Sequence, residues 1–480
     1  MENIELELTK LAAVSKALEA DETQRKEWLS KSEAVMNTFL ESLPTVKSFN
    51  KSSVNQQITS ITDEPIDIDE NLITLKNELL PKGINAASGG HLGYIPGGGL
   101  YSSAIADYIA AVSNAYSGVK YASPGAVAIE YACLDWLKKL FHFPDSAVGN
   151  LTSGGSIANL IALTSARDKF GIKNELIPKS VIYLSSQTHH CIHKSIRIIG
   201  LEDVVIREIE LDDRGRIKSD FLEKSIKKDR EEGLNPFLVI ASAGTTDTGA
   251  VDPLYDIAAI TKKEKIWFHV DAAYGGFFIL CPETKDLFKG IELADSLVID
   301  PHKGLFLPYG LGAVLIKDKE AVLKSHQYTA NYMQDANNED FLLNPADLSP
   351  ELTKHFRALR MWLPLRIHGI TPFKACLSEK LLLTKYFRQK LADLGFKIGP
   401  KPDLSVSYFW YPTGNEKENE FNKKLMEEIH NEGSVFLSST EIEGKFVIRM
   451  AILSFRTKKQ TIDRAVKMIK TCLEGVLIRT

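Results

Sequence analysis

The sequence predicts an α/β fold with a mainly parallel sheet that is covered by helices on both faces. Between residues 100 and 330, near-continuous apolar runs of strand length alternate with amphipathic segments of helical length. Runs that are apolar at every position are typical of strands buried on both faces, and helical connections join strands in parallel. A polar helical region precedes this part of the chain, and a shorter mixed region follows it.

The strand and helix candidates of the central region follow from these patterns. Apolar runs rich in Val, Ile and Phe predict strands at residues 181–184, 237–241, 266–270, 297–299 and 313–316. Apolar residues at helical spacing predict intervening helices, including 157–169 and 254–263. A doubly covered sheet is the arrangement that buries all of these segments.

Three domains are predicted for the 480 residues: an N-terminal arm at 1–85, a large α/β domain at 86–375 and a small α+β domain at 376–480. Helical spacing of apolar residues predicts that the arm is helical over 4–43, and a polar segment at 46–64 reads as a linker. Because the arm has little apolar mass of its own, we expect it to lie against a second subunit.

Two long helices and a small mixed domain are predicted after residue 330. Ser349-Pro350-Glu351 is typical of a helix start and Gly369 of a helix end, and Thr371-Pro372 opens a second helix that runs to about Gly395. The tail alternates helices with strand candidates at 405–411, 435–437 and 446–453.

Composition and charge favour a cytoplasmic enzyme without nucleic-acid or membrane partners. The 58 Lys and Arg nearly balance the 62 Asp and Glu, which gives a net charge of −4. No apolar run is long enough to span a membrane, and the N-terminus has no targeting pattern. The five cysteines are odd in number and scattered, as expected of reduced thiols.

Polar side chains follow the predicted strands, at the points where each apolar run ends. The residues with the most reactive side chains are His189, Thr246, Asp271, His302 and Lys303. Ligands of open α/β sheets bind outside the carboxyl ends of the strands, so these residues are expected to converge on one site.

Asp271 and Lys303 each allow a structural and a chemical interpretation. Asp271 could cap the next helix, or it could pair with a protonated pyridine nitrogen and stabilise the charge there. Lys303 could be a solvated surface residue. Its place after a buried strand instead predicts a partly desolvated amine with a lowered pKa, which could attack an aldehyde.

A small-residue turn, Gly154-Gly155-Ser156, precedes the predicted helix 157–169. Such a turn caps many helices, but it can also hold a phosphate with free N–H groups and a hydroxyl. It matches neither a Walker loop nor a dinucleotide-binding motif. The glycine-rich segment 89–99 is either an irregular loop or one wall of a substrate pocket. The histidines around His190 lack matching ligands elsewhere, so no metal site is predicted.

Taken together, these motifs resemble the group II pyridoxal-5'-phosphate (PLP)-dependent amino acid decarboxylases, which include the aromatic amino acid, glutamate and histidine decarboxylases. The resemblance spans roughly residues 70–380, with a weaker echo at 446–457. Its strongest elements are HVDAAYGG and DPHK at their relative spacing, followed by TSGGSIAN, SSQTHH, ASPGAVAIE and FRALRMW.

The resemblance implies the type I fold of PLP-dependent transferases, with a seven-stranded large domain, in a homodimer whose active sites lie between the subunits. By the matching motifs, Lys303 carries the cofactor as a Schiff base and Asp271 pairs with the pyridine nitrogen. His189 stacks on the ring and Thr246 lies beside it. The cofactor phosphate is held by Gly154, Gly155, Ser156 and His302.

The resemblance also implies the reaction, which is decarboxylation of an L-amino acid to a primary amine and carbon dioxide. Tyr332 matches the tyrosine that returns a proton to Cα in family members, and Arg357 either binds substrate or braces the fold. The alternatives are another PLP-dependent carbon–carbon lyase or a decarboxylating aldehyde synthase, and Tyr332 argues mildly against the latter. Intact Lys303, Asp271 and His189 disfavour a PLP-binding protein without catalytic activity.

Some residues depart from the family pattern and bear on the substrate. Gly304 follows the lysine where many animal members carry Trp, and Asp300 stands where several have Asn. Ile95 and Val119 are aliphatic where aromatic amino acid decarboxylases tend to have Phe. These residues weaken the case for an aromatic substrate without identifying another amino acid.

Overall fold

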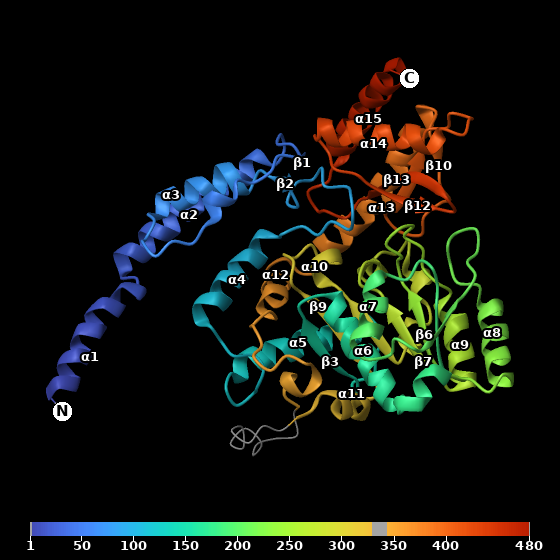
Figure 1. Ribbon diagram of the computed structural model, residues 1–480, viewed down its shortest axis with the longest axis horizontal. Helices are drawn as coiled ribbons and strands as arrows, with labels where there is room; N and C mark the ends of the chain where they lie inside the picture. The colour runs from blue at the N-terminus through green and yellow to red at the C-terminus, as the bar shows by residue number, and fades with distance from the viewer. Residues whose placement is uncertain (1, 329–342, 480) are drawn as a thin grey trace.

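The computed structural model describes residues 2–328 and 343–479. Figure 1 shows a body built around one large sheet, with an arm of helices at the N-terminal side and a smaller unit of helices and strands at the C-terminal side. Each of these parts comes from a separate stretch of the chain, in the order that the sequence predicts.

The large sheet has seven strands and is mostly parallel. Its spatial order is β3 (Val148–Thr152), β9 (Gly312–Ile316), β8 (Ser296–Ile299), β7 (Trp267–Asp271), β6 (Asn235–Ser242), β4 (Ser180–Leu184) and β5 (Val205–Glu208). Strands β4 to β8 pair in parallel, while β9 is antiparallel to both β8 and β3. The predicted fold class is confirmed, and all five strand candidates of this region form.

Both faces of the sheet are covered, because alternate residues of each strand pack into different cores. Tyr183 and Val239 belong to the core under one face, together with α5 (Pro124–Leu140), α8 (Ser219–Glu231) and α9 (Leu254–Glu264). Ile182 and Ile240 belong to the core under the other face. The helices there are α6 (Gly155–Lys169), α7 (His190–Ile198) and α11 (Lys319–His326).

The N-terminal arm consists of α1 (Glu2–Ser15), α2 (Glu22–Ser42) and α3 (Ile68–Thr74). The predicted helical stretch is interrupted before Asp21, whose side chain and that of Gln24 form a capping box that starts α2. Much of the predicted linker is irregular, apart from β1 (Phe49–Asn50), which pairs with β2 (Gly83–Ile84), and a short helical turn. In Figure 1 the arm extends away from the body.

The C-terminal unit is a four-stranded antiparallel sheet with helices against it. The strands run in the order β10 (Lys397–Ile398), β11 (Val406–Trp410), β13 (Lys445–Ala451) and β12 (Ser438–Ile442). The helices are α13 (Thr371–Asp393), α14 (Glu418–Glu432) and α15 (Lys459–Arg479). The predicted strand at 435–437 is wrong, because these buried residues form the connection before β12, where Phe436 bridges to His91. The two boundaries between the three predicted domains remain a prediction, and α13 runs across the second of them.

The first of the two predicted long helices starts later than the sequence indicated. Helix α12 spans Leu359–His368 and packs on α4 (Tyr101–Ser113), whereas residues 349–357 are irregular. A helix from Ser349 is not formed because Lys354 and Arg357 in this segment make buried polar contacts with β3. The second helix, α13, begins at Thr371 as predicted.

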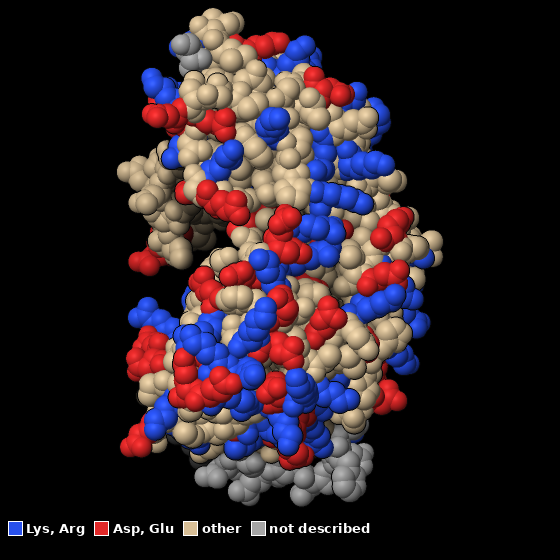
Figure 2. Space-filling model, turned by 90° about the vertical axis from the view of Figure 1, so that its right-hand side faces the viewer, with Lys and Arg blue, Asp and Glu red and all other residues tan. Residues whose placement is uncertain are grey.

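The surface shown in Figure 2 carries acidic and basic side chains interspersed with one another. Lys263 on α9 and Glu223 on α8, for example, form an ion pair at 2.7 Å. Across the described residues, no helix is both long and apolar enough to cross a membrane.

His91, in the glycine-rich segment, links pH to the stability of the fold. Its ring is buried against Phe436, and burial lowers the pKa of His91 to about 4 from 6.5. The unfolded chain therefore binds a proton that the folded chain excludes, so stability is lost as the pH falls from about 6.5 to about 4. Between about pH 6.5 and 4, the free energy of unfolding should fall by roughly 3 kcal/mol less in His91→Leu than in the wild type. Denaturant unfolding across that range measures the difference. An unchanged pH dependence would contradict the assignment.

Candidate active site

The predicted site residues of the described chain line one cavity of about 360 Å³. It lies where β4, β6, β7 and β8 end, which is the edge of the sheet that the sequence predicted. The cavity wall includes all eight of them: Gly154, Gly155, Ser156, His189, Thr246, Asp271, His302 and Lys303. Tyr332 lies outside the described residues.

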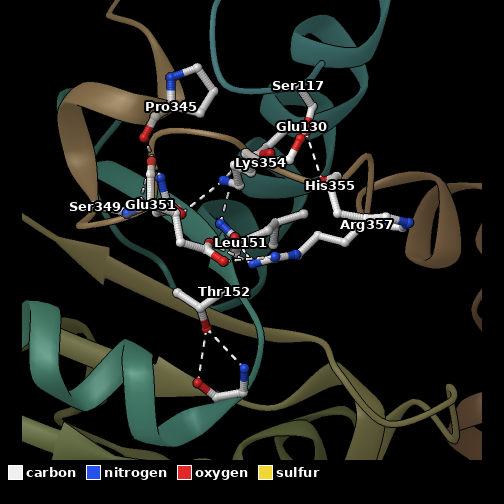
Figure 3. Close-up of polar contacts among 12 residues, drawn as sticks. Ser117, Glu130, Leu151, Thr152, Pro345, Ser349, Glu351, Lys354, His355 and Arg357 are labelled. Carbon is white, nitrogen blue, oxygen red and sulfur yellow. Dashed lines mark hydrogen bonds and ion pairs between the residues drawn. The ribbon is translucent and has the colours of Figure 1, made fainter. Parts of the chain in front are cut away.

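The turn from β3 into α6 forms one end of the cavity. The first N–H groups of a helix have no partners within the helix, so the start of α6 presents free donors. Thr152 closes the turn, since its Oγ1 donates to the Gly154 carbonyl at 2.9 Å and accepts from the Gly154 N–H at 3.3 Å (Figure 3). A side chain at Gly155 would place Cβ 2.9 Å from Asp300 Oδ2, so the close packing of this turn requires glycine.

Side chains hold the strand that leads into this turn, because β3 lies at the edge of the sheet. Glu130 Oε1 accepts from the Leu151 N–H at 3.1 Å, and Lys354 Nζ donates to that same carboxylate oxygen and to Asn150 Oδ1 (Figure 3). Lys354 and Glu130 are completely buried. This buried ion pair fixes the end of β3.

Arg357 contacts the same strand. It makes a two-pronged ion pair with Glu351, at 2.7 and 2.9 Å, and donates to the Leu151 carbonyl at 3.3 Å (Figure 3). Arg357 is not part of the cavity wall. Of the two roles left open by the sequence, bracing of the fold is the one that these contacts support.

Lys303 lies in α10 (Pro301–Gly304), directly after β8, and its ammonium contacts Asp300 Oδ2 at 2.9 Å. Burial lowers the pKa of Lys303, but the charge and hydrogen bond of Asp300, together with the charge of Asp271, raise it by more. The net pKa is therefore raised, and the predicted lowering is wrong. Asp300 lies three residues before Lys303 in the sequence, but the sequence alone did not reveal that the Asp300 carboxylate contacts the lysine.

Asp271, at the end of β7, accepts hydrogen bonds on both carboxylate oxygens. The Ala273 N–H donates to Oδ1 at 3.0 Å, and Asn159 Nδ2 donates to Oδ2 at 3.2 Å. The side chain therefore has one fixed orientation. Asn159 is a residue of the quoted motif TSGGSIAN to which the sequence interpretation gave no role.

The two histidines of the cavity each present one ring nitrogen to a backbone group. His189 Nδ1 accepts from the Cys191 N–H at 3.3 Å, and His302 Nδ1 donates to the Leu311 carbonyl at 2.6 Å. Burial lowers the pKa of both rings, although the charges of neighbouring acidic residues oppose this effect. Both are therefore neutral near pH 7, with the Nε2 atom not engaged by these backbone bonds.

Thr246 is held from the C-terminal unit by a residue that the sequence interpretation did not assign. Arg449 on β13 is buried and donates through Nε to the Thr246 carbonyl at 2.8 Å. Its Nη1 donates to Ser438 Oγ at 3.0 Å. Arg449 lies in the segment 446–457, where the resemblance to the family is weaker. That weaker resemblance was the signal in the sequence that could have drawn attention to Arg449.

Among residues 2–328 and 343–479, no group of three or more His, Cys, Asp or Glu side chains is arranged to hold a metal ion. The cavity instead combines an amine, a carboxylate and a helix start. A family model described as the pyridoxal-dependent decarboxylase conserved domain matches residues 52–412. The chain belongs to this family.

Curated relatives over most of the chain agree with the family assignment. The chain is 34% identical over 448 residues to an aromatic-L-amino-acid decarboxylase of Bacillus atrophaeus, covering 92% of each protein. It is 29% identical to a phenylacetaldehyde synthase of Arabidopsis thaliana, covering 86% of this chain and 87% of that protein. This protein is a PLP-dependent amino acid decarboxylase.

Solved structures confirm the type I fold. Oryza sativa TDC with PLP and tryptamine superposes with a TM-score of 0.89 at 23% identity, covering 95% of this chain and 98% of the other. Mouse CSAD in its apo form superposes with a TM-score of 0.86 at 22% identity, covering 94% and 99%. At these identities the likeness concerns the fold.

The residues of the decarboxylase cavity fit PLP. The start of α6 and His302 form an end suited to a phosphate, Lys303 offers the amine for the aldehyde, and Asp271 offers a carboxylate for the ring nitrogen. A further observation is that Gln187 Oε1 is buried in the cavity wall and has no hydrogen-bond partner among the described residues. A polar ligand in the cavity would satisfy it.

Proposed function

We propose that this decarboxylase converts an L-amino acid to a primary amine and carbon dioxide with PLP bound at Lys303. The observation that carries this proposal is that Lys303, Asp271 and the start of α6 share one cavity. The test is to add PLP and measure carbon dioxide release together with the cofactor's visible absorbance band at about 420 nm. Absence of the band with added PLP would overturn the proposal.

The roles proposed for the cavity side chains rest on their positions, and the role proposed for Tyr332 rests on its place in the sequence alone. The α6 N–H groups, the Ser156 hydroxyl and His302 hold the phosphate, and Asp271 accepts a hydrogen bond from the ring nitrogen. His189 covers one face of the ring, and Thr246 lies beside it. When bound, PLP supplies an electron sink for the electrons that remain at Cα as carbon dioxide leaves. Tyr332 then returns a proton to Cα.

The amino acid substrate is a separate question. The Bacillus atrophaeus relative acts on aromatic amino acids by its name, whereas Val119 and Ile95 are aliphatic in this chain. Val119 is buried and Ile95 partly buried, and neither lines the described cavity. A carbon dioxide release screen over the common L-amino acids, with the aromatic ones as one group, would identify the substrate class.

Aldehyde formation is the second candidate reaction, and the similarity to a phenylacetaldehyde synthase favours testing it. If Tyr332 protonates Cα, Tyr332→Phe should slow amine formation, because Cα is left without its proton donor. Turnover should then divert to aldehyde, with dissolved dioxygen as the oxidant, which is reduced to hydrogen peroxide, and with the nitrogen released as ammonia. Amine, aldehyde and hydrogen peroxide are measured together in the wild type and the variant. Wild-type amine rates in Tyr332→Phe would contradict this role, and aldehyde as the main wild-type product would favour the alternative.

We further propose that the protein is a homodimer with active sites at the subunit interface and that the N-terminal arm is part of this interface. Helices α1 and α2 and the turn between them (Lys16–Leu18) expose several large apolar side chains, with Val14 76% and Leu18 91% exposed. In Figure 1 none of the labelled helices or strands of the described residues packs along α1. Exposed apolar surface of this kind indicates a protein partner, and a second copy of the chain supplies one.

The dimer proposal predicts that Leu11→Gln combined with Val14→Gln weakens association. Both side chains are exposed in α1, so the change leaves the folded subunit intact while it removes apolar contact area. Sedimentation velocity should show a dimer for the wild type and a dissociation constant at least about tenfold higher for the variant. The matched control is Lys10→Gln on the same helix. A monomeric wild type at micromolar concentration would contradict the proposal.

We also propose a cytoplasmic location. All five cysteines are free thiols, and four of them are buried. Free thiols persist in a reducing compartment. Fractionation of cells that express the full-length protein would test this.

A further inference from the structure

Asp271 stands at the end of a buried chain of side-chain hydrogen bonds that runs along β7, on the face of the sheet that α6 covers. Trp267 Nε1 donates to Ser296 Oγ at 2.8 Å, and the same oxygen is 2.8 Å from His269 Nδ1. His269 Nε2 is 2.8 Å from Asn159 Oδ1, and Asn159 Nδ2 reaches Asp271 Oδ2 at 3.2 Å. All five side chains are buried.

The directions of the two bonds nearest Asp271 are fixed by its carboxylate. A carboxylate only accepts, so the Asn159 amide must turn its NH₂ group towards it. The same NH₂ group also lies 3.5 Å from the sulfur of Cys191. Asn159 Oδ1 therefore faces His269 and accepts, which requires a proton on Nε2 of the histidine.

The bond directions from the Trp267 end agree. An indole N–H only donates, so Ser296 Oγ accepts from Trp267 and its single hydroxyl proton is left for His269 Nδ1. A proton on both ring nitrogens would leave the Ser296 hydroxyl without an acceptor in the core. Burial also lowers the pKa of His269 to about 4, which disfavours the charged ring. Both ends thus give a neutral His269 with its proton on Nε2.

We propose that Asn159 and His269 are positioning residues that hold the Asp271 carboxylate in one orientation towards the ring nitrogen of the cofactor. The chain delivers a donor to Oδ2, and the Ala273 N–H supplies the other donor to Oδ1. Preorganised hydrogen bonds of this kind tune the group they contact more than they add stability of their own. This inference rests on the proposed role of Asp271.

The first test needs no cofactor. Full-length protein labelled with ¹⁵N-histidine is examined by long-range ¹H–¹⁵N correlation, and His269 is identified by the signal that disappears in His269→Gln. The expected result is a neutral ring with the proton on Nε2 between about pH 6 and 8. A proton on Nδ1, or a charged ring, overturns the proposed chain of bonds.

The second test separates positioning of Asp271 from a general effect on folding. Dissociation constants are measured for PLP and for its 1-deaza analogue, which has a carbon in place of the ring nitrogen. Asn159→Leu should raise the dissociation constant of PLP on the order of tenfold and that of the analogue far less, because only PLP uses the Asp271 hydrogen bond. His269→Gln should retain more affinity than His269→Leu, since an amide can still donate to Asn159. Equal weakening of both ligands overturns the proposal.

The control variant is Ser165→Ala. Ser165 is a buried residue of α6 whose hydroxyl donates within the helix to Ile161 at 2.9 Å, so the variant should bind both ligands like the wild type. A wild type that binds neither PLP nor the analogue would overturn the proposed function. The histidine result from the cofactor-free protein would still stand, so the two failures are distinguishable.

Discussion

Lys303→Ala is expected to reduce steady-state decarboxylation by several orders of magnitude and to abolish the visible absorbance band with added PLP. The lysine amine is the nucleophile that the cavity offers to an aldehyde, and Asp271 and Asp300 place two carboxylates around it. Because two buried acidic groups lose their cation, the variant is also expected to be less stable. Carbon dioxide release, the absorbance spectrum and thermal unfolding are measured on the same preparation.

A second substitution keeps this test valid if the alanine variant folds poorly. Lys303→Arg retains a cation beside Asp300 but removes the primary amine, so it should fold and still fail to turn over substrate. Lys194→Ala on the exposed face of α7 is the matched control and should behave like the wild type. Sustained turnover by Lys303→Arg would remove Lys303 from its proposed role.

Much of the large sheet could be predicted because most of its strands are short, near-continuously apolar and separated by helices. The two strands that were not predicted are at the edges of the sheet. Strand β3 contains Gly149 and Asn150, and β5 is only partly buried, so neither shows a continuous apolar run. An edge strand depends on contacts with side chains from other parts of the chain, such as Glu130 for β3. The local sequence of the strand does not include these residues, so its pattern does not reveal them.

The site residues could be located because they follow strands that end at the same edge of the sheet. What the sequence could not provide was the contacts between side chains that are distant in the chain. Asn159 and His269 are 110 residues apart and Lys354 and Glu130 are 224 apart, yet each pair is in contact. The raised pKa of Lys303 has the same kind of cause, since it depends on where the Asp300 and Asp271 carboxylates lie.

The same reasoning explains the late start of α12. Ser349-Pro350 has the local pattern of a helix start, but a helix there would have to give up the buried contacts of Lys354 and Arg357 with β3. Ser117 adds to the cost, because its hydroxyl donates to the carbonyls of Lys354 and His355 at 3.1 and 2.8 Å (Figure 3). Tertiary contacts therefore outweigh the local preference at this segment.

Lys354→Met is expected to lower the free energy of unfolding by about 3–5 kcal/mol. Lys354 and Glu130 are both fully buried, so removal of the lysine leaves a carboxylate in the core without its cation. Within residues 2–328 and 343–479, Glu130 Oε2 has no hydrogen-bond partner, so the Leu151 N–H is the donor that remains for this side chain. Denaturant unfolding of the full-length protein measures the loss, with and without PLP.

The double variant Lys354→Met with Glu130→Gln tests whether the loss comes from the uncompensated charge. Glutamine removes the charge but keeps an oxygen for the Leu151 N–H, so the double variant should recover most of the stability that the single variant loses. Lys424→Met is the matched control, because Lys424 pairs with Glu420 and the two side chains are 52% and 59% exposed, so it should cost no more than about 1 kcal/mol. If the double variant were as unstable as the single one, the cost would lie in the lost packing of Lys354. Because Leu151 lies three residues before Gly154, recovery of stability should be accompanied by recovery of PLP affinity, which ties this ion pair to the phosphate end of the cavity.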